Sequence, residues 1–395
     1  MTLTVAPSTT PAPAIHRGAL GAALLLVAGG ALMIATAVSL RQSTLFLVGV
    51  AAGIVLYHAA FGFTSSWRDL IANGRGGGLR AQMLMLAVTT AVFVPLISQG
   101  SVFGQAVRGS VAPAGVPVLA GAFLFGVGMQ LGGGCASGTL FSAGGGSIRM
   151  FATLAAFIAG SVLGVRYTSL WEQAPTLRAM SLVGEFGAVP AVVISLIAFA
   201  AIYLVTLTVE RKRYGVVHRD RAADTWRALH GPWTLAAGAL GLALVNIATL
   251  VLAGRPWGVT AAFALWGSKM LMAVGVDVAS WPYWQPAARA ADLHASVLRD
   301  VTSVMDIGIM LGACAAAALA GRFAPVWRVP TRSLAAAIIG GLMLGYGARI
   351  AFGCNIGAYF SGVASTSLHG WVWLAAAFTG NILGTRLRPW FGLGV

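Results

Sequence analysis

The sequence is poor in charged residues, and above all in acidic ones. Only 9% of its 395 residues are charged and only 10 are Asp or Glu, whereas roughly a quarter of the residues of a soluble domain are charged. No charged residue occurs in 18–40, 81–107 or 109–148, and a helix needs about 20 apolar residues to cross a bilayer. The composition therefore predicts an all-α integral membrane protein with about 9–11 transmembrane helices.

Sequence motifs of familiar chemistry are absent as well. The three cysteines, Cys135, Cys314 and Cys354, form no CxxC or CxxCH pattern, which argues against structural disulfides and haem attachment. No Walker, Rossmann or HExxH motif occurs. A metal generally needs more ligands than two cysteines, and no His is close to Cys135 or Cys354 in the sequence. We expect a transporter or permease rather than an enzyme, with no cofactor and no metal.

Positive charge is abundant by comparison. The formal net charge is +15, and Lys212 and Lys269 are the only lysines. The basic residues fall in short loops between apolar spans, where they orient helices and contact anionic lipid, so we expect membrane lipid as a partner and no nucleic acid. The connection 209–231 is predicted to be cytoplasmic in a multi-pass protein of the bacterial inner membrane, because it holds six of these residues: Arg211, Lys212, Arg213, Arg219, Arg221 and Arg227.

This connection divides the chain into two halves that resemble each other. We expect a disordered lead at 1–16, a first transmembrane half at 17–208, the basic loop at 209–231 and a second half at 232–395. A shift of 219 residues aligns GVGMQLGGGCASGTLFS with GYGARIAFGCNIGAYFS, so that Cys135 meets Cys354. Eleven apolar spans place six crossings between the copies, which implies parallel repeats. A re-entrant element in 114–148 would make them inverted, and the orientation stays open.

Glycines around both cysteines predict interrupted helices: Gly134, Gly138, Gly353 and Gly357. Glycine permits positive φ and close approach of a ligand to the backbone, and the N–H groups at the start of a broken helix attract anions. Close helix packing alone would also explain the glycines, but it gives no reason for a thiol in both copies. Repeated, Gly-interrupted segments are typical of transporters with a site near the midplane. The thiols would donate weak S–H hydrogen bonds, carry a persulfide or, least readily, bind a metal.

The GxGxxxxGGCxxG string, its second copy ending in FGCNIG and the stretch FGFTSSWRD from Phe61 to Asp69 resemble the YeeE/YedE family of sulphur-transport membrane proteins. The resemblance covers both halves and implies uptake of thiosulfate, a small sulphur-containing anion, with Cys135 and Cys354 passing the anion along by S–H hydrogen bonds. A third pathway cysteine of the family is replaced here by Gly62. The alternative is a sulphur or selenium carrier that forms a cysteine persulfide and passes sulphur to a cytoplasmic acceptor protein.

Three polar residues in apolar surroundings are further candidates for the path. Lys269 is the only charged residue between Arg255 and Asp277, and an ionisable residue in such a span is by default a functional hypothesis. It either faces the anion or is structural, by snorkelling or by pairing with an Asp. Gln130 and Arg349 occupy equivalent places, each five residues before a motif cysteine. We expect them to line opposite mouths of the path, although Arg349 would also serve as an interfacial anchor.

Overall fold

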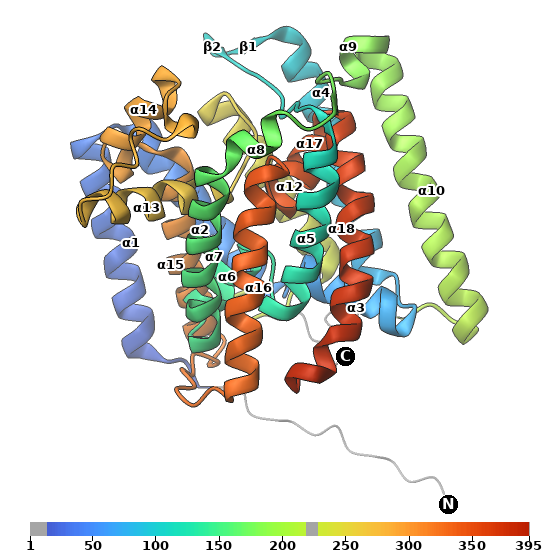
Figure 1. Cartoon of the computed structure of the whole chain (residues 1–395). Helices are drawn as coiled ribbons and strands as arrows, with labels where there is room; N and C mark the ends of the chain where they lie inside the picture. The colour runs from blue at the N-terminus through green and yellow to red at the C-terminus, as the bar shows by residue number, and fades with distance from the viewer. Residues whose placement is uncertain (1–13, 219–227, 395) are drawn as a thin grey trace, which may run out of the picture.

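A computed structural model describes residues 14–218 and 228–394, and it is almost entirely helical (Figure 1). Helices suit a bilayer because each satisfies its own backbone hydrogen bonds. The elements are α1 (Arg17–Ala37), α2 (Leu40–His58), α3 (Phe63–Asn73), α4 (Gly77–Gln99), β1 (Ser101–Val102), β2 (Gln105–Ala106), β3 (Ala114–Gly115), α5 (Val116–Gly132), α6 (Ala136–Gly144), α7 (Ile148–Arg166), α8 (Thr168–Glu172), β4 (Thr176–Leu177), α9 (Leu182–Phe186), α10 (Ala188–Tyr214), α12 (Leu235–Ala253), α13 (Thr260–Ala273), η1 (Pro282–Trp284), α14 (Ala287–His294), η2 (Val297–Arg299), α15 (Val301–Leu319), α16 (Thr331–Ile350), η3 (Asn355–Phe360), α17 (Ser361–Ala364), α18 (Leu368–Leu387) and η4 (Arg388–Phe391).

Within the described residues, nine helical segments are long and apolar enough to cross a membrane. This confirms the predicted all-α membrane protein. One apolar span differs from the expectation: 257–276 is helical only over α13, whose 14 residues reach about 21 Å, short of a hydrocarbon core of about 30 Å. The strands form only two short antiparallel pairs, β1 with β2 and β3 with β4. The fold is therefore a helical bundle, and its short strand pairs lie in the connections between helices.

The repeated helices α5 and α16 cross at the centre and run antiparallel. A Cβ added at Gly121 would lie 2.6 Å from the Gly347 carbonyl oxygen, and one added at Gly128 would lie 2.8 Å from that of Gly340. Contacts in this order require opposite directions, and such close backbone approach requires glycine. The two halves are thus inverted copies. The short α13 explains this result, because leaving it out gives an odd number of crossings between the copies.

The helices that flank this crossing also pack in equivalent ways in the two halves. Gly126 of α5 packs against α18, where an added Cβ would lie 2.1 Å from the Ala377 oxygen. Its counterpart Gly345 of α16 packs in the same way against α7, 2.2 Å from the Phe157 oxygen. At the periphery, α1 packs on α15 as α10 packs on α4, and α1 and α10 lie at opposite edges of the molecule (Figure 1).

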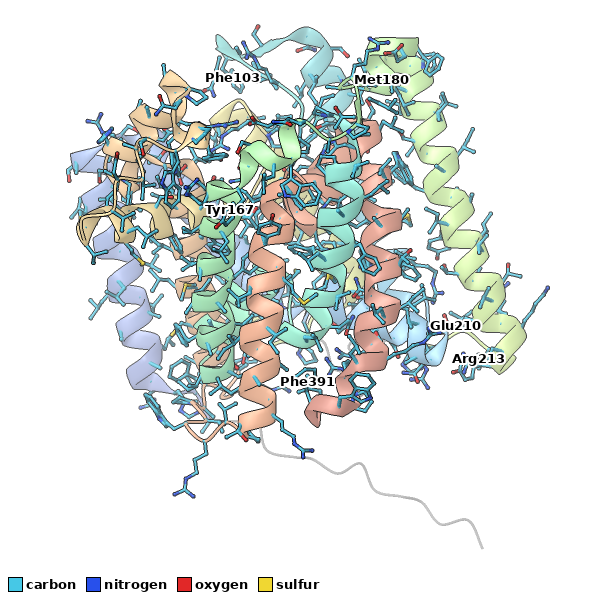
Figure 2. The ribbon with its side chains drawn as sticks, viewed as in Figure 1. Phe103, Tyr167, Met180, Glu210, Arg213 and Phe391 are labelled. Carbon is cyan, nitrogen blue, oxygen red and sulfur yellow. The ribbon has the colours of Figure 1, made fainter. Side chains whose placement is uncertain are left out.

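Several helix ends with basic residues meet on one face, the lower one in Figures 1 and 2, which we call the basic face. The N–H of His16, just before α1, donates to the Ala318 oxygen at the end of α15. Arg149 at the start of α7 donates to Ser333 at the start of α16 at 2.8 Å, and Arg213 lies at the lower end of α10 (Figure 2). Of the expected lead at 1–16, residues 1–13 lie outside the described residues, as do 219–227 of the loop 209–231, whereas 209–214 belong to α10.

Candidate functional site

Each motif cysteine directly follows a break in a membrane-spanning segment. In the first half, α5 ends at Gly132, and Gly133 turns the chain with a left-handed φ of +89°. Cys135 then has an extended backbone, with φ −78° and ψ −169°, and is the N-cap of α6. Its Sγ accepts a hydrogen bond from the Gly138 N–H at 3.5 Å. The predicted interruption is thus a turn that leaves the thiol at the N-terminus of a short helix.

The second half repeats this arrangement with one difference. After α16, Phe352 and Gly353 take left-handed φ values of +59° and +145°. Cys354 follows with an extended backbone, φ −110° and ψ −166°, at the start of η3. Trp373 holds the break in place, since its indole Nε1–H donates to the Gly353 oxygen at 3.3 Å. Phe352 stands where the first half has Gly133.

The absence of a side chain at Gly138 and Gly357 leaves a small free space beside each thiol. A Cβ at Gly138 would lie 3.5 Å from the Cys135 Sγ, and one at Gly357 would lie 3.9 Å from the nearest atom. Gly134 and Gly353 instead let the chain fold back closely, because an added Cβ would lie 3.1 Å and 2.9 Å from the backbone of the following turn. The four predicted glycines therefore lie around the two thiols.

The structure brings the two motif cysteines together in one core cluster. The short helices that follow the two cysteines, α6 and η3, contact each other. Their exposed fractions are 0% and 1%, and all three cysteines are free. Cys314 is only half-buried, on α15. The paired thiols are thus closed off from both faces in this conformation.

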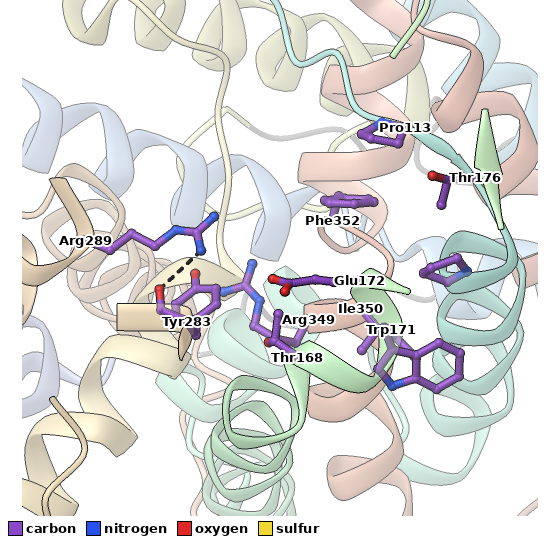
Figure 3. Close-up of a pocket in the computed structure, with 11 residues that line it drawn as sticks. Pro113, Thr168, Trp171, Glu172, Thr176, Tyr283, Arg289, Arg349, Ile350 and Phe352 are labelled. Atoms are coloured by element: carbon purple, nitrogen blue, oxygen red, sulfur yellow. Dashed lines mark hydrogen bonds between the residues drawn. The ribbon is translucent and has the colours of Figure 1, made fainter. Parts of the chain in front are cut away.

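A cavity of about 290 Å³, the outer cavity, is lined by residues of α8, α14 and the end of α16 (Figure 3), and α8 and α14 lie away from the basic face (Figure 1). Arg289 and Arg349 hold their guanidinium carbons 4.3 Å and 5.1 Å from the centre of the Tyr283 ring, in the geometry of cation–π contacts. The Arg349 Nη1 is buried and has no hydrogen-bond partner among the described residues. Phe352, two residues before Cys354, forms part of the wall and is 44% exposed.

Gln130, the counterpart of Arg349, lies towards the basic face at the end of α5. It is fully buried, and its Nε2 donates to the Thr64 oxygen and to the Asn381 Oδ1 at 3.1 Å and 2.7 Å. Arg388 donates to the Gln130 carbonyl oxygen at 2.7 Å. Gln130 and Arg349 therefore lie towards opposite faces, with the thiols between them.

Three arginines surround this end of α5, and we call them the basic mouth: Arg68, Arg149 and Arg388. Arg149 donates to the Gly132 and Leu131 oxygens at 2.7 Å and 2.6 Å, which are unpaired carbonyls at the negative end of the helix dipole. Burial, followed by the charges of Arg68 and Arg149, lowers the pKa of Arg388 to about 10. Gly133, which lies between this cluster and Cys135 in the chain, is exposed.

Lys269 lies apart from the thiols. Its Nζ donates to the Leu293 and Ala295 oxygens, both at 2.6 Å, and so ties α13 to the end of α14. Burial lowers the pKa of Lys269, and the nearby Asp292 carboxylate raises it. Hydrogen bonds to backbone carbonyls thus take the place of the Asp pairing that the sequence suggested as the structural role.

Arg149 and Arg388 are site residues that no pattern in the sequence distinguishes. They lie close to Gln130 only because α5, α7 and η4 converge on the basic face. Their spacing in the sequence carries no signal of this. Both arginines flank apolar spans in the sequence, and this position predicts that they lie at the membrane interface, not that they line a transport path.

The chain matches known proteins along most of its length. The family model described as sulphur transport covers residues 58–383. The thiosulfate transporter TsuA of Spirochaeta thermophila is 28% identical over 368 residues, which are 87% of this chain and 97% of the relative.

Two shorter matches are named probable transporter YedE. The Escherichia coli protein is 36% identical over 168 residues, 42% of this chain, and the Salmonella typhimurium protein is 32% identical over 167 residues, 41% of this chain. The chain spans only 39% and 40% of the lengths of these two relatives. Because the family model covers well over half of the sequence, the chain belongs to the sulphur transport family of membrane proteins.

Proposed function

We propose that the protein takes up thiosulfate, or a related small sulphur-containing anion, along a path through its centre. The anion enters at the outer cavity, passes Cys354 and then Cys135, and leaves at the basic mouth. The observation that carries this proposal is the placement of two buried thiols at the N-termini of inverted short helices, between two clusters of arginine. The match to TsuA, a thiosulfate transporter, supports the substrate class.

The two kinds of group have different tasks along this path. Arginines at the openings attract an anion and raise its local concentration. At the thiols, backbone N–H groups and helix dipoles take over from water, while the S–H groups donate only weakly. Weak and repeated binding suits transport, because an anion must be able to leave each position.

We place the basic face at the cytoplasmic side of a bacterial inner membrane, in contact with anionic lipid. The positive-inside rule supports this orientation. For the halves we keep the basic loop 209–231 as the connection between 17–208 and 232–395.

The test is uptake of radiolabelled thiosulfate by proteoliposomes, in competition with unlabelled thiosulfate, sulfite, sulfate and selenite. The proposal predicts saturable uptake that thiosulfate suppresses best. Mass spectrometry of the same protein addresses the rival function, a persulfide carrier that serves a cytoplasmic acceptor. A lasting covalent sulphur adduct on Cys135 or Cys354, without uptake, would support that rival and contradict transport.

A further inference from the structure

A carboxyl group lies unpaired in the interior next to the path. Asp306 of α15 has an exposed fraction of 0%, and neither of its carboxyl oxygens has a hydrogen-bond partner among residues 14–218 and 228–394. It is five residues from the start of a membrane-spanning helix, about 8 Å along the axis. A carboxylate at such a position without a partner is strongly disfavoured, so the carboxyl group carries a proton in this conformation.

The surroundings of Asp306 link it to the anion path. The helix that carries Asp306, α15, packs against α6, which begins after Cys135, and α6 in turn contacts η3, which begins after Cys354. The amide of Asn355, the next residue after that cysteine, also lacks a partner for its Nδ2 and its Oδ1 among the described residues. An ionised Asp306 would repel an anion at Cys354, whereas a protonated one would not.

Polar side chains extend from the face of the outer cavity to within one helical turn of Asp306. One turn before Asp306, the Ser303 hydroxyl donates to the Asp300 Oδ2 at 2.6 Å and accepts from the Trp266 indole at 2.8 Å. Asp300 is partly exposed and lies 3.9 Å from Arg255. Ser303 is three residues from both Asp300 and Asp306 and is thus a neighbour of each on the helix surface, which gives a proton a short route from this face to Asp306.

No cation in the described part of the chain forms an ion pair with Asp306. Among the elements that pack against α15, α6 contributes Cys135, η2 leads into Asp300, and Lys269 of α13 is bonded to carbonyl oxygens. The ionisable residues of α1 and α2 lie near the helix ends: Arg17, Arg41, Tyr57 and His58.

We propose that Asp306 is a proton-binding site that couples proton movement to anion uptake. This inference rests on the proposed transport function. A proton enters by Asp300 and Ser303 and neutralises Asp306, and only then does the anion occupy the position at Cys354. After the anion has left towards the basic face, Asp306 releases its proton to the same side and is ready for the next cycle. Each uptake event therefore brings one proton with it, and uptake rises as the pH outside falls.

The experiment uses the full chain in proteoliposomes that contain a pH-sensitive dye, with labelled thiosulfate outside at about pH 5.5 to about pH 8. The wild type should acidify the interior during uptake, and its uptake should fall by up to about tenfold per pH unit on the alkaline side of the titration. Asp306→Asn, which is neutral at every pH, should transport thiosulfate without acidification and with a flat pH profile. Asp306→Glu should restore both effects.

Asp277→Asn is the matched control, since Asp277 is exposed and its carboxylate accepts a hydrogen bond from the Ser280 N–H. It should behave as the wild type. Three results would overturn the inference: a wild-type pH profile in Asp306→Asn, no uptake by folded Asp306→Asn at any pH, or uptake that needs sodium and moves no proton. Absence of thiosulfate uptake by the wild type would contradict the proposed function itself.

Discussion

At the scale of single residues, the account depends on the difference between the three thiols. Cys135 and Cys354 are buried at helix N-termini, whereas Cys314 lies half-buried on a continuous helix. Cys135→Ala and Cys354→Ala should each abolish uptake, and Cys314→Ala should retain most of it. Each change removes one sulphur atom and should lower the free energy of unfolding by only about 1 kcal/mol. Uptake per folded molecule, from transport and size-exclusion measurements, distinguishes these outcomes, and equal loss in all three variants would argue against a thiol path.

Arg349 should matter through its charge at the outer cavity. In Arg349→Gln the residue becomes that of the equivalent position, Gln130. Loss of about 1.4 kcal/mol of attraction should raise the half-saturating thiosulfate concentration about tenfold, with little change in the maximal rate. Arg178→Gln is the control, because Arg178 is exposed and pairs with Glu185. A concentration dependence unchanged from the wild type in Arg349→Gln would remove Arg349 from the path.

The repeat made the centre of the site predictable, because each copy of the motif supports the other. Both cysteines and the four glycines next to them could be assigned from one shift in register. The basic mouth could not be predicted in this way, since Arg68, Arg149 and Arg388 come from separate elements. Lys269 shows the opposite limit. Its apolar surroundings in the sequence suggested a place in the path. In the structure its Nζ donates to the carbonyl oxygens of Leu293 and Ala295, which are 24 and 26 residues further along the chain, so the sequence around Lys269 does not indicate this contact.

At the scale of helices, the packing around the inverted crossing depends on glycines, because an added Cβ would collide with the backbone of the neighbouring helix. Gly345→Leu should destabilise the protein by about 3 kcal/mol or more, because the new Cβ would lie 2.2 Å from the Phe157 oxygen and α16 would have to move away from α7. Gly29→Leu in α1 is the control, since nothing lies within 4 Å of a Cβ at that position. Thermal unfolding in detergent provides the measurement. A melting temperature of Gly345→Leu equal to that of Gly29→Leu would contradict this packing.

Apolar composition alone could not give the direction of the repeats. The span 257–276 is apolar apart from Lys269, yet only Thr260–Ala273 is helical and this helix is too short to cross. Whether a short apolar helix crosses a bilayer or packs beside other helices depends on tertiary contacts with elements such as α7 and α15. One such helix decides between parallel and inverted halves.

At the scale of the whole molecule, the distribution of charge predicts the orientation in the membrane. The basic face contains the ends of helices with these residues: Arg17, Arg149, Arg211, Lys212, Arg213, Arg332, Arg386 and Arg388. A cysteine introduced at Val216, which is 70% exposed after α10, should be protected from an impermeant thiol reagent in intact spheroplasts. One introduced at Phe103, which is 95% exposed on the opposite face (Figure 2), should react. Both variants require a background without the three native cysteines, and the reverse labelling pattern would invert the proposed direction of transport.

The central claim is that a sulphur-containing anion crosses the membrane past two buried thiols. The most direct measurement compares labelled thiosulfate uptake by proteoliposomes containing the wild type and the Cys135→Ala/Cys354→Ala double variant, at equal amounts of folded protein. The account predicts saturable uptake by the wild type and uptake by the double variant no greater than that of empty liposomes. Undiminished uptake by the double variant would contradict the thiol path and would leave the backbone N–H groups of the interrupted helices to carry the anion alone.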